Sequence, residues 1–211
     1  MKLRIIYNKM LWELGIRKIL PSHFIKKIKI EDNNEQLVHV NQTELVRESV
    51  KIKLEEAKKF LPEGFSFFVA EGYRSPQRQQ EMWDIEFSII KEQNPNLDEI
   101  EIDRLTSLRI ARPGTNSGAH QTGGAIDITV LDEKGIPLEM GTDIVEFNKK
   151  TITESNFLNS EEISNRKILI HALSRVGFNN YPAEWWHWSY GDKMWAAYKK
   201  RPYAIYGPIE D

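Results

Sequence analysis

The sequence predicts an α+β fold, in which a small and mainly antiparallel sheet is flanked by helices. Two observations lead to this class. Segments of helical spacing occur towards both ends of the chain, and short β-branched or aromatic runs are scattered between them without regular βαβ alternation. The length of 211 residues suits one domain with a single hydrophobic core.

Helices are expected where apolar residues recur at helical spacing next to start and stop signals. Ser75 is a suitable N-cap and Pro76 fits a first helical turn, so one helix should begin there. Gly177 should end another, because glycine readily adopts the left-handed conformation after a helix. The expected helices cover residues 42–61, 75–92, 97–110 and 160–176, with a short last helix carrying Met194, Trp195 and Tyr198.

Extended segments are expected between these helices. Residues 65–70 form a dense apolar run after a Pro-Glu-Gly turn, and residues 125–130 are rich in β-branched side chains. Residues 111–124, which lead into the second run, contain four glycines and several small polar residues, a composition typical of a loop. The aromatic run 184–190 is also expected to be extended.

The composition indicates a soluble globular protein, with 40% hydrophobic and 28% charged residues. The 29 basic and 31 acidic side chains give a formal net charge of -2, so no global attraction to nucleic acid is expected. The absence of cysteine excludes a disulfide framework, a thiol nucleophile and a cysteine-ligated metal site.

Residues 1–40 are expected to form a basic N-terminal arm packed on a single domain of residues 41–211. The first 30 residues hold eight Lys or Arg and one acid, Glu13. A solvated arm is the simpler interpretation, and contact with a membrane surface through an amphipathic helix is the alternative. The chain shows neither the apolar core of a signal peptide nor the ~18 apolar residues of a membrane span, so a cytoplasmic location is expected.

Five histidines are the natural candidates for metal ligands in a chain without cysteine. His120 lies in the glycine-rich loop and His187 in the aromatic run, and each has an acid at short spacing, Asp127 and Glu184. Asp127 interrupts an apolar strand, where a buried carboxylate would need a partner such as a metal; a solvent-exposed face of the strand is the alternative. The remaining histidines are expected to be structural or surface residues: His23, His39 and His171.

Arg74 is a further candidate functional residue. It closes the segment Glu71-Gly72-Tyr73-Arg74, which follows the first apolar strand and precedes a helix. Strand-to-helix junctions often display functional side chains on rigid scaffolding. A salt bridge or a helix cap is the alternative role for this arginine.

Taken together, these segments resemble the D-alanyl-D-alanine dipeptidases, a branch of the zinc D,D-peptidases of bacterial cell-wall metabolism. The resemblance covers about residues 44–207. It rests on three motifs in the family's order: Glu71-Gly-Tyr-Arg74-Ser with Gln79 and Trp83, His120-x-x-Gly123-x-Ala125-x-Asp127, and Glu184-Trp-Trp-His187-Trp-Ser-Tyr-Gly191-Asp192.

The resemblance implies a zinc peptidase domain with one zinc ion per chain. His120, Asp127 and His187 would be its ligands, with a fourth position left for water, as a catalytic zinc requires. Glu184 would transfer the proton of that water to the leaving amine. Arg74 would stabilise the negative charge that develops on the substrate carbonyl oxygen.

The resemblance also points to residues that would contact the substrate. Tyr73 and Ser117 are candidates beside the ligands, although Gly118 stands where the family usually has serine two positions before the first zinc histidine. The family carries an acid further downstream that receives the free amine of the substrate. Asp143 and Glu146 are the nearest counterparts in this chain.

The implied function is hydrolysis of D-Ala-D-Ala to two D-alanines, so the expected partner is a small D-amino-acid dipeptide or a peptide derived from peptidoglycan. One alternative is a D,D- or L,D-carboxypeptidase that acts on peptidoglycan stem peptides. A second is a non-catalytic zinc-binding module on the same fold.

The spacing of Glu184 and His187 predicts a local irregularity. Residues three apart face opposite sides of an ideal strand, so a bulge there, or a turn that includes Glu184, is needed for both to face one metal. The surrounding aromatic residues are expected to wall the zinc site and fill the core, since no basic stripe interleaves them as in a nucleic-acid-binding surface. They are Trp185, Trp186, Trp188, Tyr190, Trp195 and Tyr198.

Overall fold

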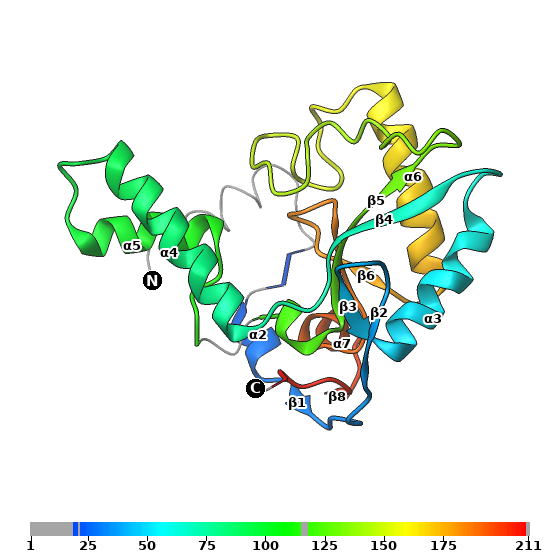
Figure 1. Ribbon diagram of the computed structural model, residues 1–211, viewed down its shortest axis with the longest axis horizontal. Helices are drawn as coiled ribbons and strands as arrows, with labels where there is room; N and C mark the ends of the chain where they lie inside the picture. The colour runs from blue at the N-terminus through cyan, green and yellow to red at the C-terminus, as the bar shows by residue number, and fades with distance from the viewer. Residues whose placement is uncertain (1–18, 21, 115–117, 210–211) are drawn as a thin grey trace.

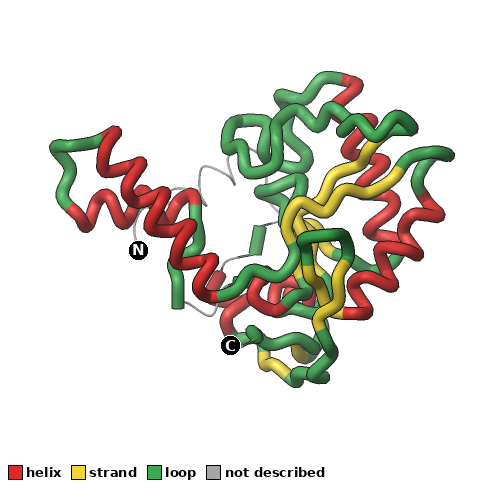
Figure 2. The backbone as a smooth tube through the Cα atoms, in the orientation of Figure 1, coloured by secondary structure: helices red, strands yellow, loops and turns green. Residues whose placement is uncertain are grey.

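The computed structural model describes residues 19–20, 22–114 and 118–209 (Figure 1). Its centre is a four-stranded sheet in the order β4-β5-β7-β6, and each neighbouring pair is antiparallel. Helices and strands are mixed along the chain, as Figure 2 shows, so the expected α+β class is confirmed. The strands of this sheet are β4 (Ser66–Glu71), β5 (Ala125–Leu131), β6 (Asn179–Asn180) and β7 (His187–Ser189).

Most of the expected helices are present. Ser75 caps its helix as predicted, because its side chain accepts a hydrogen bond from the backbone of Arg78. A capping box of Asn159 and Glu162 begins another helix. The helices are α2 (Ser22–Lys26), α3 (Glu48–Ala57), α4 (Pro76–Gln93), α5 (Glu99–Arg109), α6 (Ser160–Arg175) and α7 (Lys193–Tyr198), with 3-10 turns η1 (Lys58–Phe60) and η2 (His120–Thr122).

The single helix expected over residues 42–61 is wrong at its start. Residues Leu45–Arg47 form strand β3, which pairs antiparallel with β2 (Leu37–His39), and α3 begins only at Glu48. Leu45 and Val46 fit a strand as well as a helix, and the pairing partner that decides between them lies outside the helical window.

The extended segment expected over residues 184–190 is also wrong in its first half. β7 covers only His187–Ser189, and Glu184 lies in the turn before it. In that turn the Glu184 amide donates to the Tyr181 carbonyl at 2.9 Å, and the His187 amide donates to the Glu184 carbonyl at 3.3 Å. The predicted irregularity is therefore present, and it is a turn rather than a bulge.

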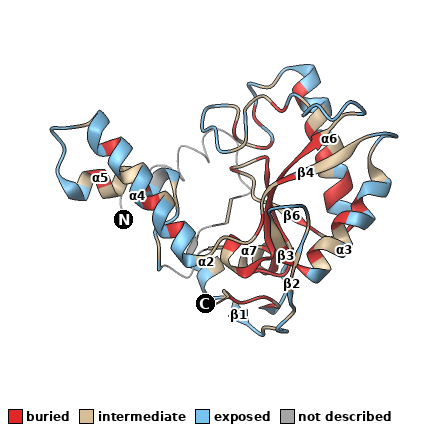
Figure 3. Ribbon diagram, viewed as in Figure 1, coloured by how far each residue is buried: buried red, intermediate tan, exposed pale blue. Residues whose placement is uncertain are grey.

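The two faces of β5 serve different purposes. Ile126, Ile128 and Val130 belong to the main hydrophobic core together with side chains of α3 and α6. Figure 3 shows the buried parts of the sheet and of these helices in red. Because successive side chains of a strand point to opposite faces, Asp127 lies on the other face. Trp185, Trp186, Trp188 and Trp195 are buried, so the expectation that the aromatic cluster fills the core is confirmed for these four.

Helices α4 and α5 pack against each other and project from the sheet as a hairpin (Figure 1). The chain descends from the base of this hairpin through residues 110–114 towards η2. The hairpin therefore reaches the same side of the sheet as Asp127, and its base contributes to the pocket described below.

The described part of the expected N-terminal arm contacts the rest of the chain. β1 (Lys29–Ile30) pairs in parallel with β8 (Tyr203–Ala204), and the Leu20 amide donates to the Tyr198 hydroxyl at 3.0 Å. Residues 1–18, on which the membrane-contact prediction mainly depends, lie outside the described residues. Within the described ranges no helix is long and apolar enough to cross a membrane. The boundary at residue 40 and the cytoplasmic location stay predictions.

Candidate metal centre

The register of β5 and β7 creates the candidate site. Asp127 lies directly opposite His187 in this antiparallel pair, so the two side chains emerge on the same face of the sheet. His120 comes from η2, just before β5. Gly123 follows η2 with φ +68°, a left-handed conformation that favours glycine and lets the chain turn into the strand.

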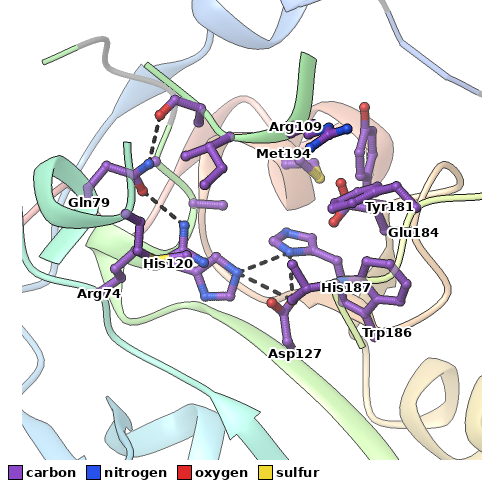
Figure 4. Close-up of a pocket in the computed structure, with 17 residues that line it drawn as sticks. Arg74, Gln79, Arg109, His120, Asp127, Tyr181, Glu184, Trp186, His187 and Met194 are labelled. Atoms are coloured by element: carbon purple, nitrogen blue, oxygen red, sulfur yellow. Dashed lines mark hydrogen bonds and ion pairs between the residues drawn. The ribbon is translucent and has the colours of Figure 1, made fainter. Parts of the chain in front are cut away.

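Three donor atoms of these residues form a nearly equilateral triangle (Figure 4). His120 Nε2 lies 3.2 Å from His187 Nδ1 and 3.3 Å from Asp127 Oδ1, and His187 Nδ1 lies 3.1 Å from Asp127 Oδ1. A tetrahedral ion with bonds of ~2.0–2.1 Å would separate its ligands by about 3.3 Å. All three side chains are buried, so the donors fit a metal ion in both number and spacing.

The ring orientation of His120 is fixed by a backbone carbonyl. Its Nδ1 lies 2.9 Å from the Gly72 oxygen, which can only accept a hydrogen bond. Nδ1 therefore carries the proton, and the Nε2 lone pair faces the triangle, as a metal ligand requires. Gly72 has no room for a side chain, since a Cβ there would lie 2.3 Å from the Leu45 carbonyl oxygen.

The electrostatics of the triangle keep Asp127 ionised. Burial by itself would raise the pKa of this carboxyl, but the adjacent imidazoles of His120 and His187 lower it well below its usual range. Burial likewise opposes protonation of His120, whose pKa the Asp127 carboxylate raises. The alternative of a solvent-exposed Asp127 is excluded, because Asp127 is only 3% exposed.

Glu184 lies at the wall of the same pocket, brought there by the turn before β7. Burial raises the pKa of its carboxyl, and the negative charge of Asp127 raises it further, although His187, His120 and Arg74 oppose this. A carboxyl whose pKa is shifted towards neutrality can both accept and return a proton near pH 7.

Arg74 lines the pocket beside the triangle and is held by two neighbours. Its Nε donates to Glu71 Oε1 at 2.7 Å while Nη2 donates to the other Glu71 oxygen, and Nη1 donates to Gln79 Oε1 at 2.9 Å. Burial would lower the pKa of Arg74, but the hydrogen bonds and charge of Glu71 raise it. Glu71 and Gln79 belong to the first motif, and the structure shows that they position the guanidinium.

Three other residues predicted to contact substrate, Tyr73, Asp143 and Glu146, are not among the described residues that line the pocket. Asp143 and Glu146 are exposed in the loop after β5, where Glu146 accepts a 3.0 Å hydrogen bond from the Asp143 amide. The Tyr73 amide donates to the Leu45 carbonyl, and Tyr73 is not among the residues that line the pocket. Ser117 lies outside the described residues.

Several pocket residues carried no sequence signal of their own. The pocket, of about 170 Å³, is small and mostly apolar beyond the donor triangle. Arg109 is its second guanidinium and comes from the end of α5. The other residues missed by sequence reasoning are Met82, Ile110, Ala111, Ala119, Val145, Phe147, Tyr181 and Met194.

The remaining histidines lie elsewhere, as expected. His23, His39 and His171 are exposed, and within the described ranges only His120, Asp127 and His187 form a group that could hold a metal ion. His171 packs edge-to-face on Phe60, with ring centroids 6.1 Å apart.

Comparison with known proteins decides the family. The model of the D-Ala-D-Ala dipeptidase family matches residues 13–205, which is nearly the whole chain. The chain belongs to the D-Ala-D-Ala dipeptidase family. The resemblance expected from the three motifs is thus confirmed.

Two curated members of this family are similar in sequence. A D-alanyl-D-alanine dipeptidase of Synechocystis sp. is 33% identical over an alignment of 108 residues; the match covers 43% of this chain and 44% of the relative. A D-alanyl-D-alanine dipeptidase of Enterococcus faecium is 27% identical over an alignment of 138 residues; the match covers 62% of this chain and 65% of the relative. The chain therefore spans less than half of the first relative's length and just under two thirds of the second's.

The fold also matches a solved structure, that of the vancomycin-resistance D,D-pentapeptidase VanY in complex with Zn(II). The TM-score is 0.50 at 19% identity, and the match covers 85% of this chain and 91% of the other. At this identity the likeness concerns the fold, and it confirms the expected zinc D,D-peptidase-like architecture.

Proposed function

We propose that this chain is a zinc-dependent peptidase that hydrolyses D-Ala-D-Ala to two D-alanines. The observation that carries the proposal is the single pocket in which the donor triangle, Glu184 and Arg74 meet. Two imidazoles and one carboxylate form a donor set that suits zinc and leaves a position open, as in catalytic zinc sites. Both curated relatives carry the name D-alanyl-D-alanine dipeptidase, which supports the choice of substrate.

The donor triangle, Glu184 and Arg74 each have a task in this reaction. A zinc ion held by the triangle would lower the pKa of a bound water molecule towards neutrality. Glu184 accepts a proton from the attacking water and delivers it to the leaving amine nitrogen, a dual role that its raised pKa favours. The residue therefore returns to its starting state after each turnover.

Arg74 stabilises the charge that develops on the substrate carbonyl oxygen. Its guanidinium is held by Glu71 and Gln79 before any substrate arrives, so little reorganisation is needed when the negative charge forms. Arg74 and Glu184 lie on opposite sides of the donor triangle (Figure 4).

The decisive experiment compares the zinc-loaded wild type with Glu184→Gln in an assay of D-alanine release from D-Ala-D-Ala. Loss of the proton-transfer group should lower kcat by ~10²–10⁴-fold. Glu63→Gln is the matched control, since Glu63 is exposed in the turn at the opposite end of β4. Equal rates for the wild type and Glu184→Gln would refute the enzymatic proposal.

A carboxypeptidase that trims stem peptides is the second candidate, and one observation favours it. Among the described residues that line the pocket, the carboxylates are Asp127 and Glu184, and both already have roles. The described part of the pocket therefore offers no further acid to receive a free α-amine. An assay of free D-Ala-D-Ala beside its N-acetylated form separates the candidates, because a dipeptidase should reject the blocked substrate.

A non-catalytic zinc-binding module is the remaining alternative. The presence of both Glu184 and Arg74 in the pocket argues against it, since a binding module needs neither group. It would be favoured if zinc bound at one equivalent while no D-amino-acid peptide was hydrolysed.

A further inference from the structure

Three buried polar atoms behind the donor triangle lack a hydrogen-bond partner among the described residues. They are His187 Nε2, Ser189 Oγ and Asp192 Oδ2. The three residues are 6%, 0% and 1% exposed, respectively. Buried polar atoms without partners are rare in folded proteins and each needs an explanation.

The three residues lie within six positions of one another, in β7 and at the start of α7. His187 and Ser189 are two apart in β7, so they point to the same face of the sheet. Asp192 follows as the N-cap of α7, where its Oδ1 accepts a 2.7 Å hydrogen bond from the Trp195 amide. Burial raises the pKa of Asp192, while the Trp195 amide and the nearby Ser189 hydroxyl oppose this shift.

The donor and acceptor chemistry of these atoms is complementary. His187 presents Nδ1 to the donor triangle, so a neutral ring that binds a metal there carries its proton on Nε2. A serine hydroxyl can accept that proton in a hydrogen bond and donate its own to a carboxylate. A hydrogen-bond chain from His187 Nε2 through Ser189 Oγ to Asp192 Oδ2 thus provides each of the three unpartnered atoms with a partner.

We propose that Ser189 and Asp192 are positioning residues that hold His187 in the tautomer and orientation needed for metal binding. The proposal rests on the zinc site of the proposed function. Ser189 would restrain the His187 ring in the same way that the Gly72 carbonyl restrains the His120 ring. The Asp192 carboxylate, at the far end of this hydrogen-bond chain, also makes His187 Nδ1 a more basic ligand.

The test is a direct measurement of zinc affinity by competition with a chromophoric chelator. Ser189→Ala and Asp192→Asn should each weaken zinc binding by ~10–100-fold, the usual effect of losing a group that orients a metal ligand. Asparagine remains a good N-cap, so the start of α7 should persist in Asp192→Asn. In the double variant the two losses of zinc affinity should not add, because both substitutions interrupt the same hydrogen-bond chain.

Thr129→Val is the matched control. Thr129 Oγ1 is also buried without a partner, and Thr129 lies on the Asp127 face of β5, but it is not part of the proposed chain. Its replacement should leave zinc affinity within about twofold of the wild type, since Thr129 takes no part in the hydrogen-bond chain proposed to orient the His187 imidazole.

A second readout is the imidazole N–H proton of His187 in the NMR spectrum of the zinc-loaded protein. It should be protected from exchange in the wild type and in Thr129→Val, and lost or shifted in Ser189→Ala. Unchanged zinc affinity in folded Ser189→Ala and Asp192→Asn would overturn the proposal, as would additive losses in the double variant. Neither readout needs turnover, so a wild type that binds zinc without hydrolysing D-Ala-D-Ala would contradict only the proposed function.

Discussion

Asp127 and Glu184 lie in one pocket, yet their pKa values are displaced in opposite directions. The imidazoles around Asp127 lower its pKa, while burial and the charge of Asp127 raise that of Glu184. A permanently charged carboxylate suits a metal ligand, and one poised nearer neutrality suits proton transfer. The different roles of these two acids, metal ligand and proton-transfer group, therefore follow from their surroundings.

The raised pKa of Glu184 has a consequence for stability. A carboxyl whose folded-state pKa exceeds its unfolded value stabilises the fold below the unfolded pKa, and this contribution is lost as pH rises through the folded pKa. Metal-free Glu184→Gln should therefore melt at a higher temperature than metal-free wild type at pH 7. The difference should shrink towards pH 4. Thermal melts in chelator across this range check it, and a wild type that is the more stable at pH 7 would contradict the assigned shift.

The geometry of Arg74 predicts that lysine cannot replace it. Lysine lacks the planar fork that donates to both Glu71 oxygens and to Gln79. Arg74→Lys should lower kcat for D-Ala-D-Ala by ~10²–10³-fold with a smaller change in KM, as for loss of an oxyanion-stabilising donor. Arg78→Lys, at an exposed position on the first turn of α4, is the control and should stay within twofold of the wild type. A kcat for Arg74→Lys near that of the control would remove Arg74 from the mechanism.

At the scale of elements, the sequence predicted well what depends on local signals. Ser75 begins α4 and the run around Asp127 forms β5, because a cap and a β-branched pattern are readable from neighbouring residues. Leu45 and Val46 were assigned to a helix instead of β3, since the pairing with β2 is a tertiary choice. Local sequence patterns predict an element correctly only where no distant pairing partner favours a different structure for the segment.

The site was predictable to the same extent. Its three potential metal ligands stand out as polar residues in a loop, a strand and an aromatic run, and the structure brings them together. Arg109 was missed because only the packing of the α4–α5 hairpin places the end of α5 at the pocket. The Gly72 carbonyl was missed for another reason, since a backbone acceptor leaves no trace in residue type.

The loop after β5 depends on one buried side chain of α6. Arg166 is 2% exposed and donates to the backbone carbonyls of Met140, Lys150, Ile152 and Thr153. Burial lowers the pKa of Arg166 to about 10, so it stays charged at neutral pH. This loop supplies Val145 and Phe147 to the pocket wall, so Arg166 links the core of the domain to substrate contacts.

Arg166→Met should therefore destabilise the fold and loosen the pocket wall. Leaving several buried carbonyls without a donor should cost about 3 kcal/mol or more. In protein that remains folded, KM for D-Ala-D-Ala should rise more than kcat falls, because the metal site lies on other elements. Urea unfolding and steady-state kinetics measure the two effects. Lys167→Met, at the exposed neighbouring position, should change neither; equal stability of the two variants would show that Arg166 does not clamp the loop.

At the scale of the whole molecule, the donor triangle joins elements that are distant in the chain. His120 comes from η2, Asp127 from β5 and His187 from β7, and 67 positions separate the two histidines. In the folded chain they converge at a sheet whose other face is closed by α3 and α6. An ion bound there would hold the native register of β5 and β7 and would bind the unfolded chain far more weakly.

Metal binding should consequently stabilise the entire domain. Free zinc at 1,000 times its Kd would add ~4 kcal/mol to the free energy of unfolding. For a chain of this size each kcal/mol raises Tm by ~2–4 °C, so a chelator should lower Tm by about 8–16 °C. His187→Ala should abolish this difference, whereas His171→Ala, which changes an exposed histidine of α6, should retain it. A chelator effect of equal size in both variants would mean that zinc stabilises the protein from a site other than the triangle.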